Sequence, residues 1–206
     1  MQPPRLRIIG DIHGQKNIHL SLIKDVSYSL AVGDIGFNYD YLKDVYPERH
    51  KCIFGNHDQY DKFDQVPHNL GHFGVWDVPN VGEVFFVRGA WSIDHAYRTV
   101  GIDWWENEEL NQEQCDQALE LYRQKKPKMM VTHCCPQSIV PFLINVHASF
   151  CGYVGPVKTR TGLLLQSMFE IHRPEQWWFG HYHRWLDKTI NNTRFVCLPE
   201  AGVFDL

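Results

Sequence analysis

Five short apolar runs in this chain each end in a cluster of Asp, Asn, His and Gly residues. In chain order the runs and their clusters read RLRIIGDIHG, YSLAVGDIG, KCIFGNHD, KMMVTHCCP and QWWFGHYH. They have the length and the β-branched or aromatic content of buried strands, and glycine or polar residues stop them. The chain is therefore predicted to carry polar side chains at the carboxyl ends of five strands.

Helical periodicity occupies the stretches between these runs. Asn111 and Gln114 have the spacing of a capping box at the start of one such stretch. Alternation of strands and helices predicts an α/β fold in which helices cover a largely buried sheet. Three predicted helical faces carry, respectively, Ile18, Leu22 and Val26; Cys115, Ala118, Leu119 and Tyr122; and Leu164, Leu165, Met168 and Ile171.

Size and charge exclude several classes of protein. A chain of 206 residues with 44% hydrophobic residues can bury one substantial core, so we expect a single domain over residues 1–206. The net charge of -4 does not favour nucleic acid as a partner. No secretory signal or membrane-length apolar run is present, and the six scattered cysteines lack CxxC spacing. We expect a cytoplasmic protein with free thiols and no membrane association.

The longest interval between two polar clusters covers about residues 59–128. It contains VGEVFFVRGAWSI, which alternates in places and is consistent with a hairpin. We expect this interval to be an insert that determines substrate specificity.

The polar clusters together offer a set of metal ligands. In α/β folds, functional groups collect beyond the carboxyl ends of the strands. Side chains two residues apart on an extended segment point the same way, so the DxH and HxH pairs are each expected to face one point. The side chains expected to meet there are Asp11, His13, Asp34, Asn56, His57, His133, His181 and His183.

The chemistry of these ligands points to divalent ions. Carboxylates, an amide oxygen and imidazoles without thiolate suit Mn, Fe or Zn, and they argue against a cysteine-based structural zinc site. Even seven of these eight groups exceed the needs of one tetrahedral ion. They suit two ions that share a bridging carboxylate.

The ordered blocks GDIHG, GD, GNHD, TH and GHYH resemble the pattern of the calcineurin-like metallophosphoesterase superfamily, and they span nearly the whole chain. The resemblance implies a four-layer α/β/β/α sandwich of two mixed sheets flanked by helices, with two metal ions in its site. It also implies the residue roles. One ion would be bound by Asp11, His13 and His183, the other by Asn56, His133 and His181, with Asp34 bridging them and His57 acting on the substrate.

These residues predict a metal-dependent phosphoesterase. Two adjacent divalent ions acidify a bridging water and stabilise charge during displacement at phosphorus, so we expect a metal-bridging hydroxide to attack. His57 is the candidate general acid, as an imidazole of near-neutral pKa beside the leaving group. We favour Mn as the metal, with Fe, Zn or Ni as alternatives. The favoured substrate is a small phosphodiester, such as a cyclic nucleotide or another nucleotide.

Three alternatives stay open. The first two are a phosphomonoesterase and a Ser/Thr-type protein phosphatase. Members of the latter branch read GDxxDRG where this chain has Phe37 and Asn38, so their orienting Asp and phosphate-binding Arg are absent at those places. The third is a non-catalytic scaffold with the same fold. His57 argues against the scaffold, because scaffold members lack the histidine of the GNH block.

Contacts to the substrate are predicted for a few further residues. Arg160 precedes a predicted helix whose N-terminus favours anions, so it is the preferred phosphate ligand, with Arg98 second. Trp104 and Trp105 suit either a wall for a nucleobase or packing of the insert, and we favour packing. His95 suits either the mouth of the site or a surface turn, and we favour the turn.

Overall fold

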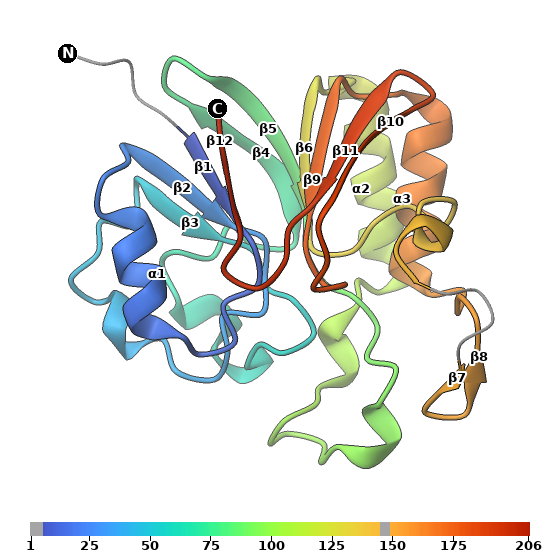
Figure 1. The fold of residues 1–206 in the computed structure, drawn as a ribbon, viewed down its shortest axis with the longest axis horizontal. Coiled ribbons are helices and arrows are strands. Elements are labelled where there is room, and N and C mark those ends of the chain that lie inside the picture. The colour runs from blue at the N-terminus through green and yellow to red at the C-terminus, as the bar shows by residue number, and fades with distance from the viewer. Residues whose placement is uncertain (1–5, 145–148) are drawn as a thin grey trace.

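Two β-sheets face each other in the computed structural model, which describes residues 6–144 and 149–206 (Figure 1). The four-stranded sheet has the order β12 (Val203–Asp205), β1 (Leu6–Ile9), β2 (Tyr28–Ala31) and β3 (His50–Cys52). The six-stranded sheet has the order β10 (Leu186–Ile190), β11 (Thr193–Cys197), β9 (Gln176–Phe179), β6 (Met129–Thr132), β5 (Gly82–Val87) and β4 (Phe73–Val78). A separate short hairpin pairs β7 (Ser149–Phe150) with β8 (Tyr153–Val154).

Both sheets are mixed. Strands β1, β2 and β3 are parallel to one another, as are β5, β6, β9 and β11, whereas β12, β4 and β10 pair antiparallel at the sheet edges. Parallel neighbours end at the same edge of their sheet. All five apolar runs with polar clusters belong to these parallel strands, so their clusters leave the sheets in a common direction.

Helices cover the outer faces of the two sheets (Figure 1). Helix α1 (Lys16–Ile23) lies against the four-stranded sheet, and α2 (Gln112–Lys125) and α3 (Arg160–Ile171) cover the six-stranded sheet. Short 3-10 helices occur at Asp40–Leu42, Tyr60–Gln65, His95–Tyr97, Glu106–Glu108 and Val140–Phe142. The predicted four-layer sandwich is confirmed.

Three buried clusters hold the layers together, and alternate strand residues supply them. On β9, Trp177 joins the cluster beneath α2 and α3, whereas Trp178 joins the cluster between the sheets; both are 0% exposed. On β1, Ile8 faces the other sheet and Ile9 faces α1. This alternation explains why the strands read as continuous apolar runs: both faces of each sheet are covered.

The second and third helices begin as their patterns predict and bury most of the predicted positions, although Ile171, at the end of α3, is 37% exposed. Asn111 and Gln114 form the capping box, with hydrogen bonds of 2.9 and 3.0 Å between each side chain and the other residue's backbone N–H. In α3, Thr159 caps the N-terminus by accepting from the Gly162 N–H. The buried positions of the two helices include Cys115, Ala118, Tyr122, Leu164, Leu165 and Met168.

The buried face predicted for the first helix is right only at Leu22, which packs against the core cluster that contains Ile23. Ile18 is 43% exposed and Val26 lies beyond the end of α1, while His19 and Ile23 point inward. His19 occupies a core position because its Nδ1 lies 2.7 Å from the Tyr41 hydroxyl, which satisfies the buried ring. Burial lowers the pKa of His19 to about 4, so the imidazole is neutral near pH 7.

The stretch VGEVFFVRGAWSI supplies one strand, β5, rather than the predicted hairpin; its antiparallel partner β4 precedes that stretch in the chain. With α2, these strands belong to the layers of the sandwich rather than to a separate attachment. Residues 88–111 form a long connection that projects below the sheets in Figure 1. The role of this interval in substrate specificity stays a prediction. Within the interval, the prediction now applies to residues 88–111.

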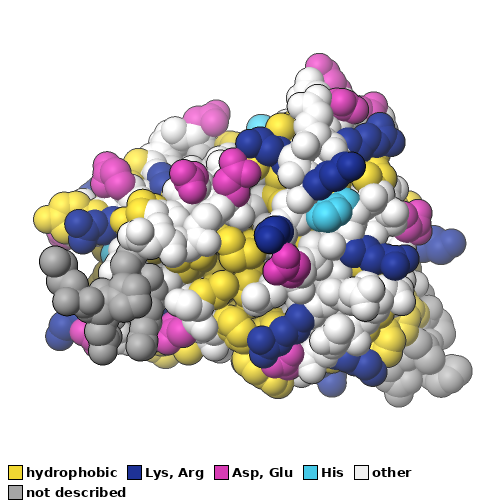
Figure 2. Space-filling model, turned by 90° about the horizontal axis from the view of Figure 1, so that it is seen from above, with side chains coloured by type: hydrophobic (Ala, Val, Ile, Leu, Met, Phe, Trp, Pro, Cys, Tyr) yellow, Lys and Arg dark blue, Asp and Glu magenta, His cyan; other side chains and the backbone are white. Residues whose placement is uncertain are grey.

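The end of the molecule opposite to residues 88–111 carries basic and acidic side chains interspersed, with hydrophobic side chains between them (Figure 2). That face therefore presents no extended field of a single sign. In the described part of the chain, no helix combines the length and apolar character needed to cross a membrane.

Candidate metal centre

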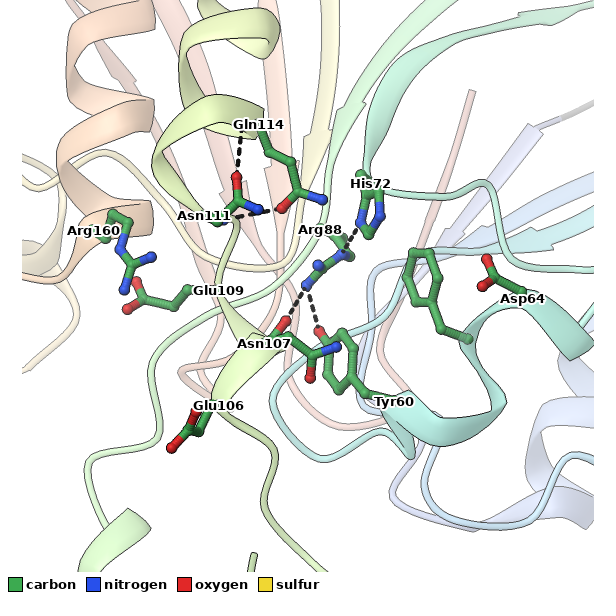
Figure 3. Close-up of a pocket in the computed structure, with 11 residues that line it drawn as sticks. Tyr60, Asp64, His72, Arg88, Glu106, Asn107, Glu109, Asn111, Gln114 and Arg160 are labelled. Atoms are coloured by element: carbon green, nitrogen blue, oxygen red, sulfur yellow. Dashed lines mark hydrogen bonds between the residues drawn. The ribbon is translucent and has the colours of Figure 1, made fainter. Parts of the chain in front are cut away.

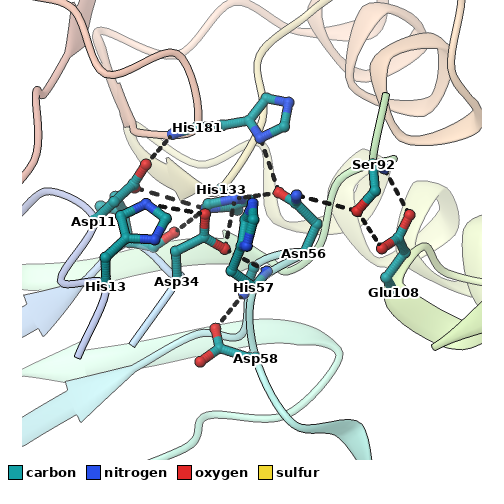
Figure 4. A network of polar contacts seen from close by, with 12 residues as sticks. Asp11, His13, Asp34, Asn56, His57, Asp58, Ser92, Glu108, His133 and His181 are labelled. Carbon is teal, nitrogen blue, oxygen red and sulfur yellow. Dashed lines mark hydrogen bonds and ion pairs between the residues drawn. The ribbon is translucent and has the colours of Figure 1, made fainter. Parts of the chain in front are cut away.

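The polar strand ends of both sheets converge on one place (Figure 4). Asp11 and His13 follow β1, Asp34 follows β2, and His133 follows β6. Asn56 and His57 come after β3, and His181 and His183 come after β9. The structure thus brings together all eight side chains that the sequence predicts for the site.

One group of ligands consists of Asp11, His13, Asp34 and His183, whose ligand atoms all lie within 4.8 Å of one another. His183 Nε2 is 3.2 Å from Asp11 Oδ2 and 2.9 Å from His13 Nε2. His13 Nε2 is in turn 3.6 Å from Asp34 Oδ2. Such convergence of two imidazole nitrogens and two carboxylates is the geometry that a shared cation requires.

A second group lies on the other side of Asp34. The Asn56 Oδ1 atom is 3.1 Å from His133 Nε2 and 2.9 Å from His181 Nδ1. Asp34 Oδ1 lies 3.3 Å from His133 Nε2. The two oxygens of Asp34 therefore face different groups, Oδ2 toward His13 and Oδ1 toward His133.

Divalent ions fit these residues on three counts. First, Asp11 Oδ1 is buried and has no hydrogen-bond partner among the described residues. Second, Asp11 and Asp34 are 0% and 1% exposed, and burial, then the Asp11 charge, raises the pKa of Asp34 well above its usual range. Two buried carboxylates so close together are costly when ionised without a cation.

The third observation is the protonation state of His133 and His181. The Nδ1 of His133 lies 2.9 Å from the Val32 carbonyl oxygen, to which it must donate, so the Nε2 lone pair faces the site. Burial lowers the pKa values of His133 and His181 to about 3. Both rings are therefore neutral near pH 7, which is the form that binds metal.

The local backbone differs from the extended segments expected for the DxH and HxH pairs. His13, His181 and His183 have φ angles of 46°, 67° and 52°, in the left-handed region. Asp34 has a φ of 50°. The paired ligands converge through tight turns after the strands rather than through strand alternation, and strained backbone of this kind concentrates at functional sites.

Two glycines allow this close packing. A Cβ atom at Gly180 would lie 2.0 Å from Asp11 Oδ1, and one at Gly55 would lie 2.2 Å from Asp34 Oδ1. The backbone of two motif glycines thus occupies space beside both carboxylates that any side chain would fill.

Asp58 is a supporting residue to which the sequence reasoning gave no role. Its buried carboxylate accepts hydrogen bonds from the Gly55 N–H at 2.7 Å, the Tyr39 hydroxyl at 3.0 Å and the Gly36 N–H at 3.1 Å. Asp58 therefore ties the loop after β2 to the loop after β3. Its signal in the sequence was its place as the last residue of the GNHD block.

We expect Asp58→Asn to destabilise the metal-free protein by about 1–3 kcal/mol at pH 4, because both oxygens of the carboxylic acid can accept from the surrounding donors whereas an amide NH₂ cannot. Burial raises the Asp58 pKa from 3.8 to about 7, so the native state binds that proton more tightly than the unfolded chain does. This stabilising contribution is full below about pH 4 and is lost as the pH rises to about 7, so the deficit of the variant should be larger at pH 4 than at pH 8.

Denaturant unfolding in the presence of a chelator measures this difference. The exposed Asp61→Asn serves as the matched control. Equal stability of Asp58→Asn and the parent protein at both pH values would contradict the assigned role.

His57 and Arg98 form a pair beside the two ligand groups. Arg98 Nη2 lies 2.7 Å from His57 Nε2 and 2.8 Å from Asp94 Oδ1. A guanidinium can only donate, so Nε2 of His57 is the acceptor and its ring is neutral. Burial, followed by the Arg98 charge, lowers the pKa of His57 to about 4, which corrects the expected near-neutral value.

Arg160 does not lie at this site. It lines a separate pocket (Figure 3). The pocket has a volume of about 420 Å³, and the Arg160 Nη1 donates to the Leu110 carbonyl at 3.1 Å. None of the eight clustered residues lines that pocket, whose wall includes the buried guanidinium of Arg88 and the buried carboxylate of Glu109. Arg98, and not Arg160, therefore lies beside the eight clustered residues.

The aromatic residues of the projecting connection pack against one another and against Phe37, in the loop after β2. Trp105 is 6% exposed, and its ring centroid lies 5.9 Å from that of Phe37. Trp104 lies 5.6 Å from His95, whose Nδ1 is 3.0 Å from the Ser92 carbonyl oxygen. Packing, rather than an open wall for a nucleobase, accounts for these contacts.

The facing mixed sheets, with their ligands at the strand ends, define the class of structure: the chain has the fold of the calcineurin-like metallophosphoesterase superfamily. No protein-family model and no curated protein sequence matches the chain. A phosphopantetheinyl hydrolase from Mycobacterium tuberculosis is similar in structure, with a TM-score of 0.52 and 14% identity over 96% of this chain and 90% of that one.

Two further solved structures share the fold. A dimetal phosphatase from Danio rerio has a TM-score of 0.50 and 11% identity, over 96% of this chain and 88% of that chain. A putative 5'-nucleotidase from Staphylococcus aureus has a TM-score of 0.52 and 15% identity, over 98% of this chain but 50% of its own length. At such identities the likeness establishes the fold, and the chemistry must be argued from the site.

Proposed function

We propose that this chain is a metal-dependent phosphoesterase that hydrolyses a small phosphodiester. The observation that carries the proposal is the shared carboxylate of Asp34, with each oxygen facing one group of neutral or anionic ligands. Asp11, His13 and His183 would hold one divalent ion, and Asn56, His133 and His181 the other. Manganese is the favoured metal, and Fe, Zn and Ni also suit these donors.

Divalent ions bound in this way supply an acidified water as nucleophile and positive charge that stabilises the phosphoryl oxygens. The remaining tasks belong to side chains outside the two ligand groups. These tasks are to hold the substrate phosphate and to protonate the leaving oxygen.

Arg98 is suited to the first task. Its side chain is 8% exposed and is fixed by Asp94, so the guanidinium is held in place at the edge of the ligand groups. A phosphate oxygen is a stronger acceptor for guanidinium than a neutral imidazole is. We therefore expect a bound substrate to take the hydrogen bond that Arg98 gives to His57 in the free protein.

His57 is suited to the second task once Arg98 has turned to the substrate. Its Nε2 is then free to carry a proton toward the leaving alkoxide, and the nearby phosphate charge raises the pKa of the ring. The backbone N–H of His57 donates to Asp34 Oδ1 at 2.8 Å, which fixes the residue next to the bridging position.

The number of cationic side chains favours a diester over a monoester. Among the described residues, Arg98 is the cationic side chain in contact with the eight-residue cluster. Asn38, where protein phosphatases carry arginine, is exposed, and its Oδ1 accepts from the Asp40 N–H. One guanidinium matches the single negative charge of a phosphodiester better than the dianion of a monoester.

The test compares hydrolysis of bis(p-nitrophenyl) phosphate and p-nitrophenyl phosphate by chelator-stripped protein reloaded with Mn, Ni, Zn or Mg. We expect a metal-dependent rate that is higher for the diester. Faster cleavage of the monoester would favour a phosphomonoesterase. Binding of two ions without cleavage of either ester would favour the non-catalytic scaffold.

Replacement of Arg98 by alanine should lower kcat/KM for the diester by about 10- to 100-fold, the equivalent of one charge-assisted hydrogen bond of about 1.5–3 kcal/mol. The metal content should stay unchanged, because the guanidinium contacts none of the proposed ligand side chains. Arg160→Ala is the matched control and should keep the parent kinetics. Equal losses in the two variants would contradict the assignment of the phosphate contact to Arg98.

A further inference from the structure

The amide of Asn56 is held from the side opposite to the histidines by two residues of the projecting connection (Figure 4). Asn56 Nδ2 donates to Ser92 Oγ at 3.2 Å, and Ser92 Oγ donates to Glu108 Oε2 at 2.6 Å. The Ser92 backbone N–H donates to the other oxygen, Glu108 Oε1, also at 2.6 Å. Ser92 and Glu108 are 1% and 2% exposed, so this is a buried network whose members are all satisfied.

The direction of these hydrogen bonds fixes which end of the amide faces the histidines. The hydroxyl hydrogen of Ser92 is committed to Glu108, so its oxygen can only accept from Asn56. The NH₂ group of Asn56 therefore points to Ser92, and Oδ1 points to His133 and His181. A rotated amide would lose its bond to Ser92 and would present a donor where a cation needs an oxygen.

Glu108 is itself immobilised by its backbone. Its carbonyl oxygen lies 3.1 Å from the Tyr60 hydroxyl and 3.1 Å from Arg88 Nη1. A Cβ atom at Gly89 would lie 2.2 Å from that oxygen, so the two backbone segments are in contact. The Tyr60 hydroxyl is also 3.0 Å from the carbonyl oxygen of Gly55, the residue before Asn56. Asn56 is therefore held at its side chain by Ser92 and at its backbone by the contact of Tyr60 with Gly55.

We propose that Ser92 and Glu108 are positioning residues that set the affinity of the Asn56, His133 and His181 position for its metal ion. The inference rests on the metal-binding part of the proposed function and assigns a role to two residues that no motif identifies. Groups that orient a metal ligand contribute about 10- to 100-fold in metal affinity. The Asp11, His13 and His183 position has no such contact with Ser92 or Glu108 among the described residues and should be unaffected.

The experiment is a calorimetric titration of the chelator-stripped protein with Mn²⁺, in which the two binding events are resolved. We expect Ser92→Ala to weaken one event by about 10- to 100-fold and to leave the other unchanged. Ser92→Thr keeps the hydroxyl and should restore the affinity. In an Asn56→Ala background, Ser92→Ala should have no further effect, because the amide that it orients is gone.

Glu108→Gln provides a second variant should Ser92→Ala fold poorly. It should weaken the same event, because a glutamine NH₂ cannot accept from Ser92. Parent affinities in Ser92→Ala or Glu108→Gln, equal weakening of both events, or an undiminished effect in the Asn56→Ala background would each overturn the inference. Hydrolysis is not part of this readout. A chain that shows the expected affinities but cleaves no ester would overturn the proposed function and leave the positioning role standing.

Discussion

Asp34→Asn is expected to lower diester hydrolysis by at least about 10³-fold, a loss of about 4 kcal/mol in transition-state stabilisation. The carboxylate has one oxygen toward His13 and the other toward His133. An amide keeps one oxygen but presents NH₂ to the other group and removes the negative charge. We therefore expect the variant to bind fewer than two ions under conditions in which the parent protein binds two.

The same substitution should not weaken the metal-free protein. Burial and the neighbouring carboxylates raise the pKa of Asp34, so the ionised form is costly in the native state. Asparagine can still accept from the His57 N–H. The melting temperature of the stripped variant should therefore equal or exceed that of the stripped parent, whereas added Mn²⁺ should stabilise the parent alone.

Calorimetric melting, metal content and hydrolysis rate together check this prediction. Asp44→Asn makes the same chemical change at an exposed position and should behave as the parent protein. Retention of two ions and parent activity by Asp34→Asn would show that the shared carboxylate is not needed.

His57→Ala is expected to lower kcat by about 10²- to 10⁴-fold, the range for loss of a general acid, with both ions retained. We expect this loss because His57 lies beside the ligand groups: its side chain contacts Arg98, and its ring lies edge-on to His13 with the ring centroids 5.2 Å apart. Metal content should therefore separate this variant from Asp34→Asn.

The dependence on the leaving group distinguishes proton transfer from a structural effect. An alkoxide needs a proton as it departs, whereas p-nitrophenolate is a far weaker base. The loss in His57→Ala should be larger for a dialkyl phosphodiester, which must release an alkoxide, than for bis(p-nitrophenyl) phosphate, which releases p-nitrophenolate. His50→Ala is a remote control. Equal losses with both leaving groups would argue against His57 as the acid.

The strand ends were predictable because the signal is local. A buried strand is a short apolar run, and the polar residues that stop it, such as Asp11 and His133, must lie at its carboxyl end. Sheet geometry then brings such ends together whatever the rest of the chain does. The capping box of Asn111 and Gln114 was equally local, and the structure contains it.

The parts of the site and core that could not be predicted from the sequence depend on contacts between distant segments. Residues 88–111 return toward the site and so bring Arg98 to His57. This segment has no hydrophobic periodicity from which its course could be predicted. His19 occupies a core position because Tyr41 supplies a partner for its ring. The Ser92 hydroxyl accepts from Asn56, which lies 36 residues earlier in the chain, and donates to Glu108, which lies 16 residues later. The low pKa of His57 likewise follows from burial and from Arg98 rather than from its motif.

The proposed phosphodiesterase activity depends on two divalent ions, one at each of the ligand groups on either side of Asp34. The most direct measurement is the rate of bis(p-nitrophenyl) phosphate hydrolysis as a function of the number of Mn²⁺ ions bound per chain. We predict that the rate appears mainly with the second ion and is absent in Asp34→Asn at any Mn²⁺ concentration. A full rate with one ion or none, or no cleavage of any phosphoester by a chain that holds two ions, would contradict the proposed function.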